Sequence, residues 1–137
     1  GFASDDNCAA MGGVSGHAGL FSNLSELSDL AQWLLELSNK DRLFKSFCTR
    51  AVPRDKGDWA LGFMIPSRPL STAGKFITDS GFGFPGFTGP SVWIDRSRQM
   101  TVTMLANRNF PTLGNPYYAG LRRQIHDLIW QMGDPNV

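Results

Sequence analysis

The residues that could do chemistry begin with a glycine-rich stretch from Gly81 to Pro90, which continues directly into residues 91–95. Glycines at 81, 83, 86 and 89 let the backbone approach another chain or a ligand without an intervening Cβ, whereas the phenylalanines between them favour burial. Pro85 has no N–H to give to a sheet, which favours an edge strand or a bulge, and an edge strand can meet a substrate. The alternative is a Gly/Pro-rich loop between two strands, which local composition alone favours.

Side chains suited to nucleophilic catalysis lie apart from that stretch. Ser15 lies in a run of small residues, but the second glycine of a G-x-S-x-G nucleophile elbow is missing at the required spacing, so Ser15 is rejected as a nucleophile. We interpret His17 as a residue that hydrogen-bonds its own loop, with a role as base or ligand as the alternative. The S-x-x-K motif of lysine-assisted serine enzymes is absent, because the nearest string, residues 72–75, has threonine first and reads as a loop.

Metal and cofactor sites are not expected. The candidate ligands occur singly along the chain, as Cys8, His17, Cys48 and His126, and a metal needs them clustered. A phosphate loop is also excluded, because the glycines of the central stretch open no helix. Two cysteines allow one disulfide, but two buried free thiols are the preferred interpretation.

Three helices are expected to position these residues. Asn23 and Glu26 form a capping box for a helix over about 24–38, and a shorter helix over 42–48 ends before Pro53. The last helix is expected to begin at Asn115-Pro116, as N-cap and first helical residue, and to end at Gly133, with His126 on its surface or flank. Its expected core stripe comprises Leu121, Ile125, Leu128, Ile129 and Met132.

The strands are expected in the second half of the chain. Residues 59–65 form an apolar run that indicates a strand, and 75–80 indicate a weaker one leading into the central stretch. A hairpin follows, with strands over 92–94 and 100–105 around the polar turn 95–99. The chain is therefore expected to be α+β, with an antiparallel sheet of about three strands and flanking helices, forming a single domain over 1–137 or part of one.

Composition narrows the classes of partner. Apolar residues make up 42% and charged residues 18%, which is typical of a folded globular protein. The net charge of +1 and the scattered basic residues give no footprint for nucleic acid or an anionic membrane. No apolar run approaches the roughly 18 residues of a membrane span. Because the chain opens on Gly1 rather than methionine, we interpret it as an excised or processed piece.

Several strings carry a resemblance to a known family. They are Phe84-Pro85-Gly86-Phe87-Thr88-Gly89, Trp93-Ile94-Asp95, Leu105 to Pro111, Asp5-Asp6-Asn7, and Gly12 to Ser22 followed by a helix. In this order they resemble the C-terminal part of the serine β-lactamase and penicillin-binding-protein family, especially class C-like β-lactamases and related esterases. The resemblance covers essentially the whole chain and suggests a periplasmic or secreted location.

The resemblance implies a role for five residues. The family's Lys-Thr-Gly or His-Thr-Gly motif falls on Phe84, Pro85 and Gly86, on the edge strand beside the nucleophile. The next residue, Phe87, is implied to donate its backbone N–H to the oxyanion hole, and Asn109 to lie near the rim of the site. Phe84 replaces a cation or imidazole and Pro85 removes a hydroxyl, which implies an apolar pocket suited to an ester or hydrophobic acyl group.

The resulting hypothesis is a C-terminal fragment of a β-lactamase-like serine hydrolase, inactive alone because the S-x-x-K nucleophile motif lies in a missing N-terminal portion. The first alternative is a non-catalytic binding or assembly module, whose strand through Phe82, Phe84 and Phe87 docks a partner; a stand-alone scaffold with a coincidental likeness is the second. An isolated fragment leaves a strand edge uncovered, so self-association or strand exchange is also expected.

Overall fold

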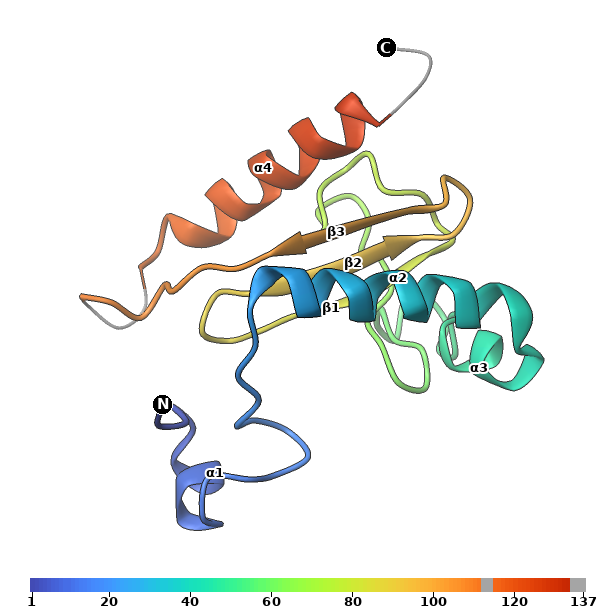
Figure 1. Cartoon of the computed structure of the whole chain (residues 1–137). Helices are drawn as coiled ribbons and strands as arrows, with labels where there is room; N and C mark the ends of the chain where they lie inside the picture. The colour runs from blue at the N-terminus through green and yellow to red at the C-terminus, as the bar shows by residue number, and fades with distance from the viewer. Residues whose placement is uncertain (112–114, 134–137) are drawn as a thin grey trace.

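The computed structural model describes residues 1–111 and 115–133. Figure 1 shows a small antiparallel sheet with one long helix on each face, so the expected α+β class is confirmed. The elements, in chain order, are α1 (Asp6–Ala10), α2 (Leu24–Lys40), α3 (Arg42–Phe47), β1 (Gly81–Pro85), β2 (Ser91–Asp95), β3 (Met100–Met104) and α4 (Tyr118–Met132).

The sheet has the order β1-β2-β3, so β1 lies at an edge. Phe82 pairs with Ile94 and Gly83 with Trp93, and directly paired residues point to the same face. The phenylalanines of β1 therefore face α2, whereas its glycines face α4. A Cβ on Gly83 would clash with the Val92 carbonyl oxygen and lie 2.8 Å from Trp93 Cε3, and one on Gly81 would lie 2.6 Å from Ile77 Cδ1. These two glycines therefore make room for neighbouring side chains.

Each face of the sheet has its own core cluster. On the α2 face, Leu35 packs with Cys48, Ile65, Phe82 and Ile94. On the α4 face, Trp93 and Trp130 pack with Ala73, Ile77 and Val102. Because strand residues alternate between faces, β2 contributes Ile94 to the first cluster and Trp93 to the second.

Helix α4 differs from the expectation in its start and in its buried face. It begins at Tyr118, and Asn115 Oδ1 accepts a hydrogen bond from the Tyr117 N–H ahead of it. The buried residues are Tyr118, Arg122, His126 and Trp130, spaced by four. The predicted core residues Leu121, Leu128 and Met132 are exposed. The prediction that His126 lies on the surface or flank is also wrong, because its side chain is fully buried.

Two expected strands are absent from the described part of the chain, and one helix was not expected. Residues 59–65 make only isolated bridges, of Trp59 with Met64 and of Met64 with Gly83, because the Ala60 N–H turns back to the Phe63 carbonyl. Residues 75–80 are turns and bends. Helix α1 is a single short segment capped by Asp5.

Other expectations for the elements hold. Asn23 caps α2, which extends to Lys40, and α3 ends with Cys48 as its C-cap. Both cysteines are buried free thiols, as preferred, and burial raises the pKa of Cys48 to about 11. In the described residues, none of the helices has the length and apolar character required to cross a bilayer.

Candidate functional site

The outer edge of β1 is where the sequence places the candidate site, and it is only partly occupied. Gly83 exchanges two hydrogen bonds with Met64, at 2.9 and 3.0 Å. The Gly81 N–H donates to the Thr78 carbonyl at 3.0 Å, and Pro85 has no N–H. The strand is thus an edge strand with one bridge across its outer side, and its backbone is not paired along its whole length.

A tight turn after β1 presents the Phe87 backbone. The Gly86 N–H donates to the Pro90 carbonyl at 2.7 Å, and the Gly89 N–H donates to the Gly86 carbonyl at 3.2 Å. Within the described ranges, the Phe87 N–H reaches no acceptor. Phe87 is 67% exposed, so the turn that carries this unused donor lies at the surface.

The segment after β3 lies against the same turn. The Arg108 N–H donates to the Thr88 carbonyl at 2.9 Å, and the Arg108 guanidinium lies 4.6 Å from the centre of the Phe87 ring. Asn109 follows directly, and its N–H donates to Asn107 Oδ1 at 3.0 Å. Both polar atoms of the Asn109 side chain are buried and make no hydrogen bond to any described residue. The structure therefore brings the Asn107–Asn109 segment to the turn that holds Phe87.

Phe84 extends the apolar character of the edge. Its side chain is 51% exposed and its ring lies 6.1 Å from that of Trp59, which is 45% exposed. The two rings form an apolar surface beside the edge. A phenyl ring has no charge or hydrogen-bonding atom with which to hold a carboxylate.

The four ligand candidates do not form one group, although the Cys8 N–H and His17 both bond to Asp5 Oδ1. Over the described ranges, no group of three or more His, Cys, Asp or Glu side chains could hold a metal ion. His126 Nε2 lies 3.0 Å from Ser91 Oγ, but both residues are buried between α4 and the sheet. Burial lowers the pKa of His126 to about 4, so this pair is neutral and structural near pH 7.

The N-terminal segment contains an arrangement that has no local signal in the sequence. Ser15 Oγ lies 3.2 Å from His17 Nδ1, and His17 Nε2 lies 2.9 Å from Asp5 Oδ1. The prediction that His17 hydrogen-bonds its own loop is confirmed by the contact with Ser15. Asp5 was not considered, because it lies 12 residues before His17 and only the fold of α1 brings it close.

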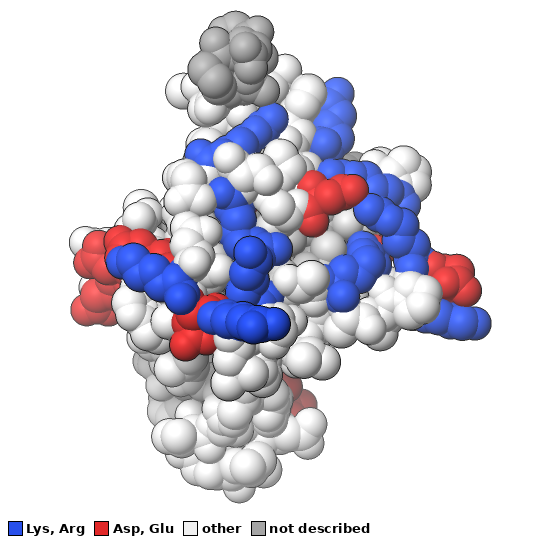
Figure 2. All heavy atoms as spheres, turned by 90° about the vertical axis from the view of Figure 1, so that its right-hand side faces the viewer, with Lys and Arg blue, Asp and Glu red and all other residues white. Residues whose placement is uncertain are grey.

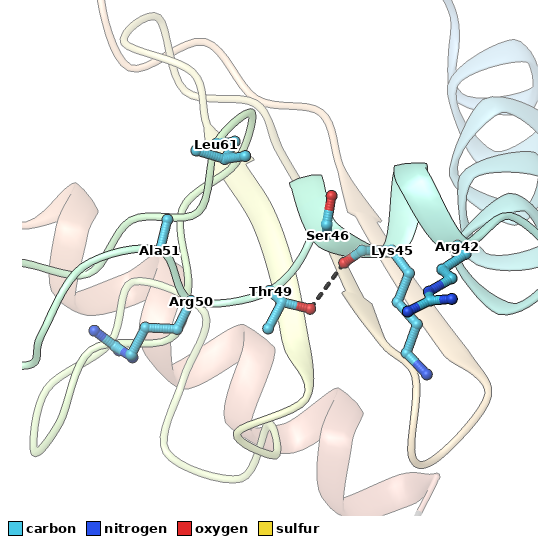
Figure 3. Close-up of a pocket in the computed structure, with 7 residues that line it drawn as sticks. All are labelled: Arg42, Lys45, Ser46, Thr49, Arg50, Ala51 and Leu61. Carbon is cyan, nitrogen blue, oxygen red and sulfur yellow. Dashed lines mark hydrogen bonds between the residues drawn. The ribbon is translucent and has the colours of Figure 1, made fainter.

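A shallow basic pocket lies beside α3. Figure 2 shows Lys and Arg side chains gathered over the face of the molecule that includes α3, with fewer acidic side chains among them. In Figure 3, Arg42 and Lys45 extend to the same side of α3, whereas Arg50 extends away from them. Arg50 donates to the Gly57 carbonyl and to Asp58 Oδ1, both at 2.7 Å. The pocket contains no residue of the β1 edge.

Comparisons with known proteins identify the family of the chain. The sequence model of the β-lactamase family matches residues 2–127. A protein of Escherichia coli strain K12, named as a candidate D-alanyl-D-alanine carboxypeptidase, is 32% identical over 117 residues, which are 78% of this chain and 26% of that protein. A protein of the same name from Salmonella gallinarum is 33% identical over 116 residues, with the same coverage. The chain thus spans about a quarter of the length of these relatives.

A solved structure shares the fold. A β-lactamase from Mycobacterium bovis superimposes with a TM-score of 0.68 at 19% identity, covering 92% of this chain and 53% of that one. The matching region includes nearly all of the chain, as does the family match. The chain therefore belongs to the β-lactamase family.

Proposed function

We propose that the chain is the C-terminal part of a serine hydrolase of this family and forms one wall of its active site. The remaining portion of the protein supplies the nucleophile. The proposal is supported most directly by the Phe87 N–H, which belongs to an exposed residue on a turn at the end of an edge strand and bonds to no described residue. A donor in such a place suits the stabilisation of an oxyanion in acyl transfer.

We further propose that the acyl group is hydrophobic. Phe84 and Trp59 give the wall an apolar surface, and Phe84 stands where the family's motif has a cation or imidazole. Asn109, with an unused side-chain amide behind the turn, is the polar residue that we place at the rim. An ester or a hydrophobic amide fits this wall better than a β-lactam that carries a carboxylate.

The oxyanion role is tested in the full-length protein that contains this chain. Phe87→Pro removes the N–H and is expected to lower kcat about 10²- to 10³-fold in ester hydrolysis. Phe87→Ala, which keeps the N–H and removes only the ring, is the matched control and is expected to retain most of kcat. Equal loss in the two variants would contradict the oxyanion role.

Substrate class is tested separately with Phe84→Lys. The wild type is expected to hydrolyse a 4-nitrophenyl ester and to resist acylation by a fluorescent penicillin. The lysine variant is expected to be acylated by the penicillin at least about tenfold faster than the wild type, because Lys supplies a partner for the penicillin carboxylate. Ready penicillin acylation of the wild type would contradict the apolar pocket. If the folded full-length protein turns over none of these substrates, the fold serves as a non-catalytic binding module, and the proposal of a hydrolase is wrong.

A further inference from the structure

The Ser15, His17 and Asp5 side chains form a continuous chain of hydrogen bonds, remote in sequence from the β1 edge. Asp5 Oδ1 accepts hydrogen bonds from the Cys8 N–H at 2.8 Å and from His17 Nε2 at 2.9 Å. The Cys8 N–H and, second, the His17 bond lower the pKa of the Asp5 carboxyl group, so it is a carboxylate at neutral pH. A carboxylate cannot donate, so Nε2 must carry the proton in this contact.

The tautomer fixed by Asp5 decides what faces Ser15. With the proton on Nε2, the neutral imidazole presents Nδ1 as an acceptor, and Ser15 Oγ lies 3.2 Å from it. The Ser15 hydroxyl also lies 3.1 Å from the Ala18 carbonyl, which is the second acceptor within its reach. A serine hydroxyl beside an unprotonated imidazole nitrogen, with the opposite nitrogen held by a carboxylate, is the arrangement that activates a serine nucleophile.

The surroundings of Ser15 leave room for a substrate. The His17 and Asp5 side chains are 51% and 40% exposed, so small molecules in solution can reach them. An ideal Cβ on Gly16 would meet no atom within 4 Å, so the loop is open at the residue that follows Ser15. In the described residues, the amides of Ser15, Gly16 and His17 donate no hydrogen bond, so donors for a developing oxyanion are available in the same loop.

Although Ser15 lacks the glycine spacing of a nucleophile elbow, and is rejected as a nucleophile on that ground, its contacts with His17 and Asp5 reopen the question. We propose that Ser15, His17 and Asp5 form an esterase-type site that takes small activated acyl esters, independently of the site at β1. Ser15 Oγ attacks the ester carbonyl and forms the new C–O bond, while its proton passes to His17 Nδ1. The bond from the carbonyl carbon to the alkoxy or phenoxy group then breaks, and that group leaves with the proton or as a phenolate. Water attacks the acyl-Ser15 ester, releases the acid and returns a proton to Ser15. Asp5 is a positioning residue that sets the tautomer.

The test uses the full-length protein that contains this chain, in a variant whose S-x-x-K serine is replaced by alanine, so that the nucleophile of the proposed hydrolase is removed and the two proposals are separated. The probes are 4-nitrophenyl acetate, followed by release of 4-nitrophenolate, and a fluorophosphonate, followed by mass spectrometry of the labelled peptide. We expect one adduct on Ser15. Ser15→Ala and His17→Gln are each expected to lower the rate of nitrophenolate release at least about tenfold, less than in a buried triad because the site is exposed.

Controls separate catalysis from folding. Ser25→Ala removes an exposed serine of α2 and is expected to leave both rate and labelling unchanged. Asp5→Asn keeps a side-chain oxygen that can cap α1 but loses the carboxylate, and is expected to lower kcat while KM stays the same. No adduct on Ser15, labelling that persists in the His17→Gln variant, or equal rates in the Ser15→Ala and Ser25→Ala variants would each overturn the proposal.

Discussion

The two faces of the sheet are covered by helices of similar length that use different chemistry. Helix α2 meets an apolar cluster, in which Leu35 packs against Phe82 and Ile94. Helix α4 buries two ionisable side chains, Arg122 and His126, in addition to Trp130. The interface of α2 with the sheet is stabilised by apolar packing, and that of α4 is stabilised by apolar packing and by hydrogen bonds.

Burial removes water from the polar groups on the α4 face, and several of them find a partner in the protein, whereas His126 Nδ1 and Arg122 Nε and Nη1 make no hydrogen bond to a described residue. His126 Nε2 lies 3.0 Å from Ser91 Oγ, and Trp130 Nε1–H donates to the Ala73 carbonyl at 2.7 Å. The Tyr118 hydroxyl donates to the Gly89 carbonyl. Arg122 stacks at 5.3 Å over the Tyr118 ring, and burial lowers the pKa of its guanidinium. Such bonds fix the position of α4 along β2, which an apolar interface alone specifies less strictly.

The largest expected effect is that of Trp130→Ala. It opens a cavity in the α4 cluster and leaves the Ala73 carbonyl without its donor, so the free energy of unfolding should fall by about 3–5 kcal/mol. Trp33→Ala removes a tryptophan of α2 that is 56% exposed and should cost less than about 1 kcal/mol. Urea unfolding curves measure both. Equal losses of unfolding free energy in the two variants would show that the α4 interface contributes no more to stability than an exposed position of α2.

Acidification should destabilise the α4 face through His126. The unfolded histidine takes up a proton below pH about 6.5, whereas the folded one stays neutral down to about 4 because it is buried. The unfolded state thus binds more protons in this window, and stability falls as the pH drops from about 6.5 to 4, by about 3 kcal/mol in total. Nearby Arg122 adds to the shift and Asp127 opposes it.

The matched variant for this pH effect is His126→Gln, whose amide can still bond to Ser91. Its unfolding free energy should vary less over the same pH range than that of the wild type, and the difference between the two curves isolates His126. Parallel curves would mean that carboxyl groups elsewhere cause the whole dependence.

A smaller effect is expected at β1, where the two faces meet in one strand. Gly83→Ala would place a Cβ against the Val92 carbonyl oxygen and 2.8 Å from Trp93 Cε3, and this overpacking should cost about 1–3 kcal/mol. Gly120→Ala, on the open side of α4 with no atom within 4 Å, should instead raise stability by up to about 1 kcal/mol. Thermal melting distinguishes the two. A neutral Gly83 variant would indicate that β1 can shift away from Trp93.

The smallest effect concerns the starts of the two helices. Asn23 Oδ1 accepts from the Glu26 N–H at 3.0 Å, whereas Tyr117 at the start of α4 makes no capping bond with its side chain. Asn23→Ala should therefore cost about 1 kcal/mol, and Tyr117→Ala only a few tenths. Chemical denaturation provides the comparison. A larger loss at Tyr117 would point to a packing role for its exposed ring.

Local signals in the sequence predicted most elements, and tertiary contacts decided the rest. The capping box at Asn23, the polar turn 95–99 and Gly133 mark boundaries that depend on neighbouring residues, and the structure confirms them. The α4 stripe was assigned wrongly because Leu121 and Leu128 read as core and Arg122 and His126 as surface. Only the partners on β2 and its flanking turn make the polar stripe the buried one.

The candidate site was predictable in part. Pro85 correctly indicated an edge strand, and the chemistry of Phe84 follows from its type alone. The glycines were explained differently by the structure, since Gly81 and Gly83 make room for Ile77 and Trp93 rather than for a ligand. The approach of Arg108 to Phe87 depends on chain segments 21 residues apart and has no local signal.

The outer side of β1 also limits how copies of this chain can join. The backbone groups of Gly81, Gly83 and Pro85 point away from β2. The N–H groups of Gly81 and Gly83 already donate hydrogen bonds, and Pro85 has no N–H. An incoming strand would find no free hydrogen there, so the ladder cannot grow into a fibril from this side. Chains that associate at high concentration through this side should therefore do so by contacts between the exposed rings of Trp59, Phe84 and Phe87. Such aggregates should dissolve in mild detergent and give no thioflavin T fluorescence.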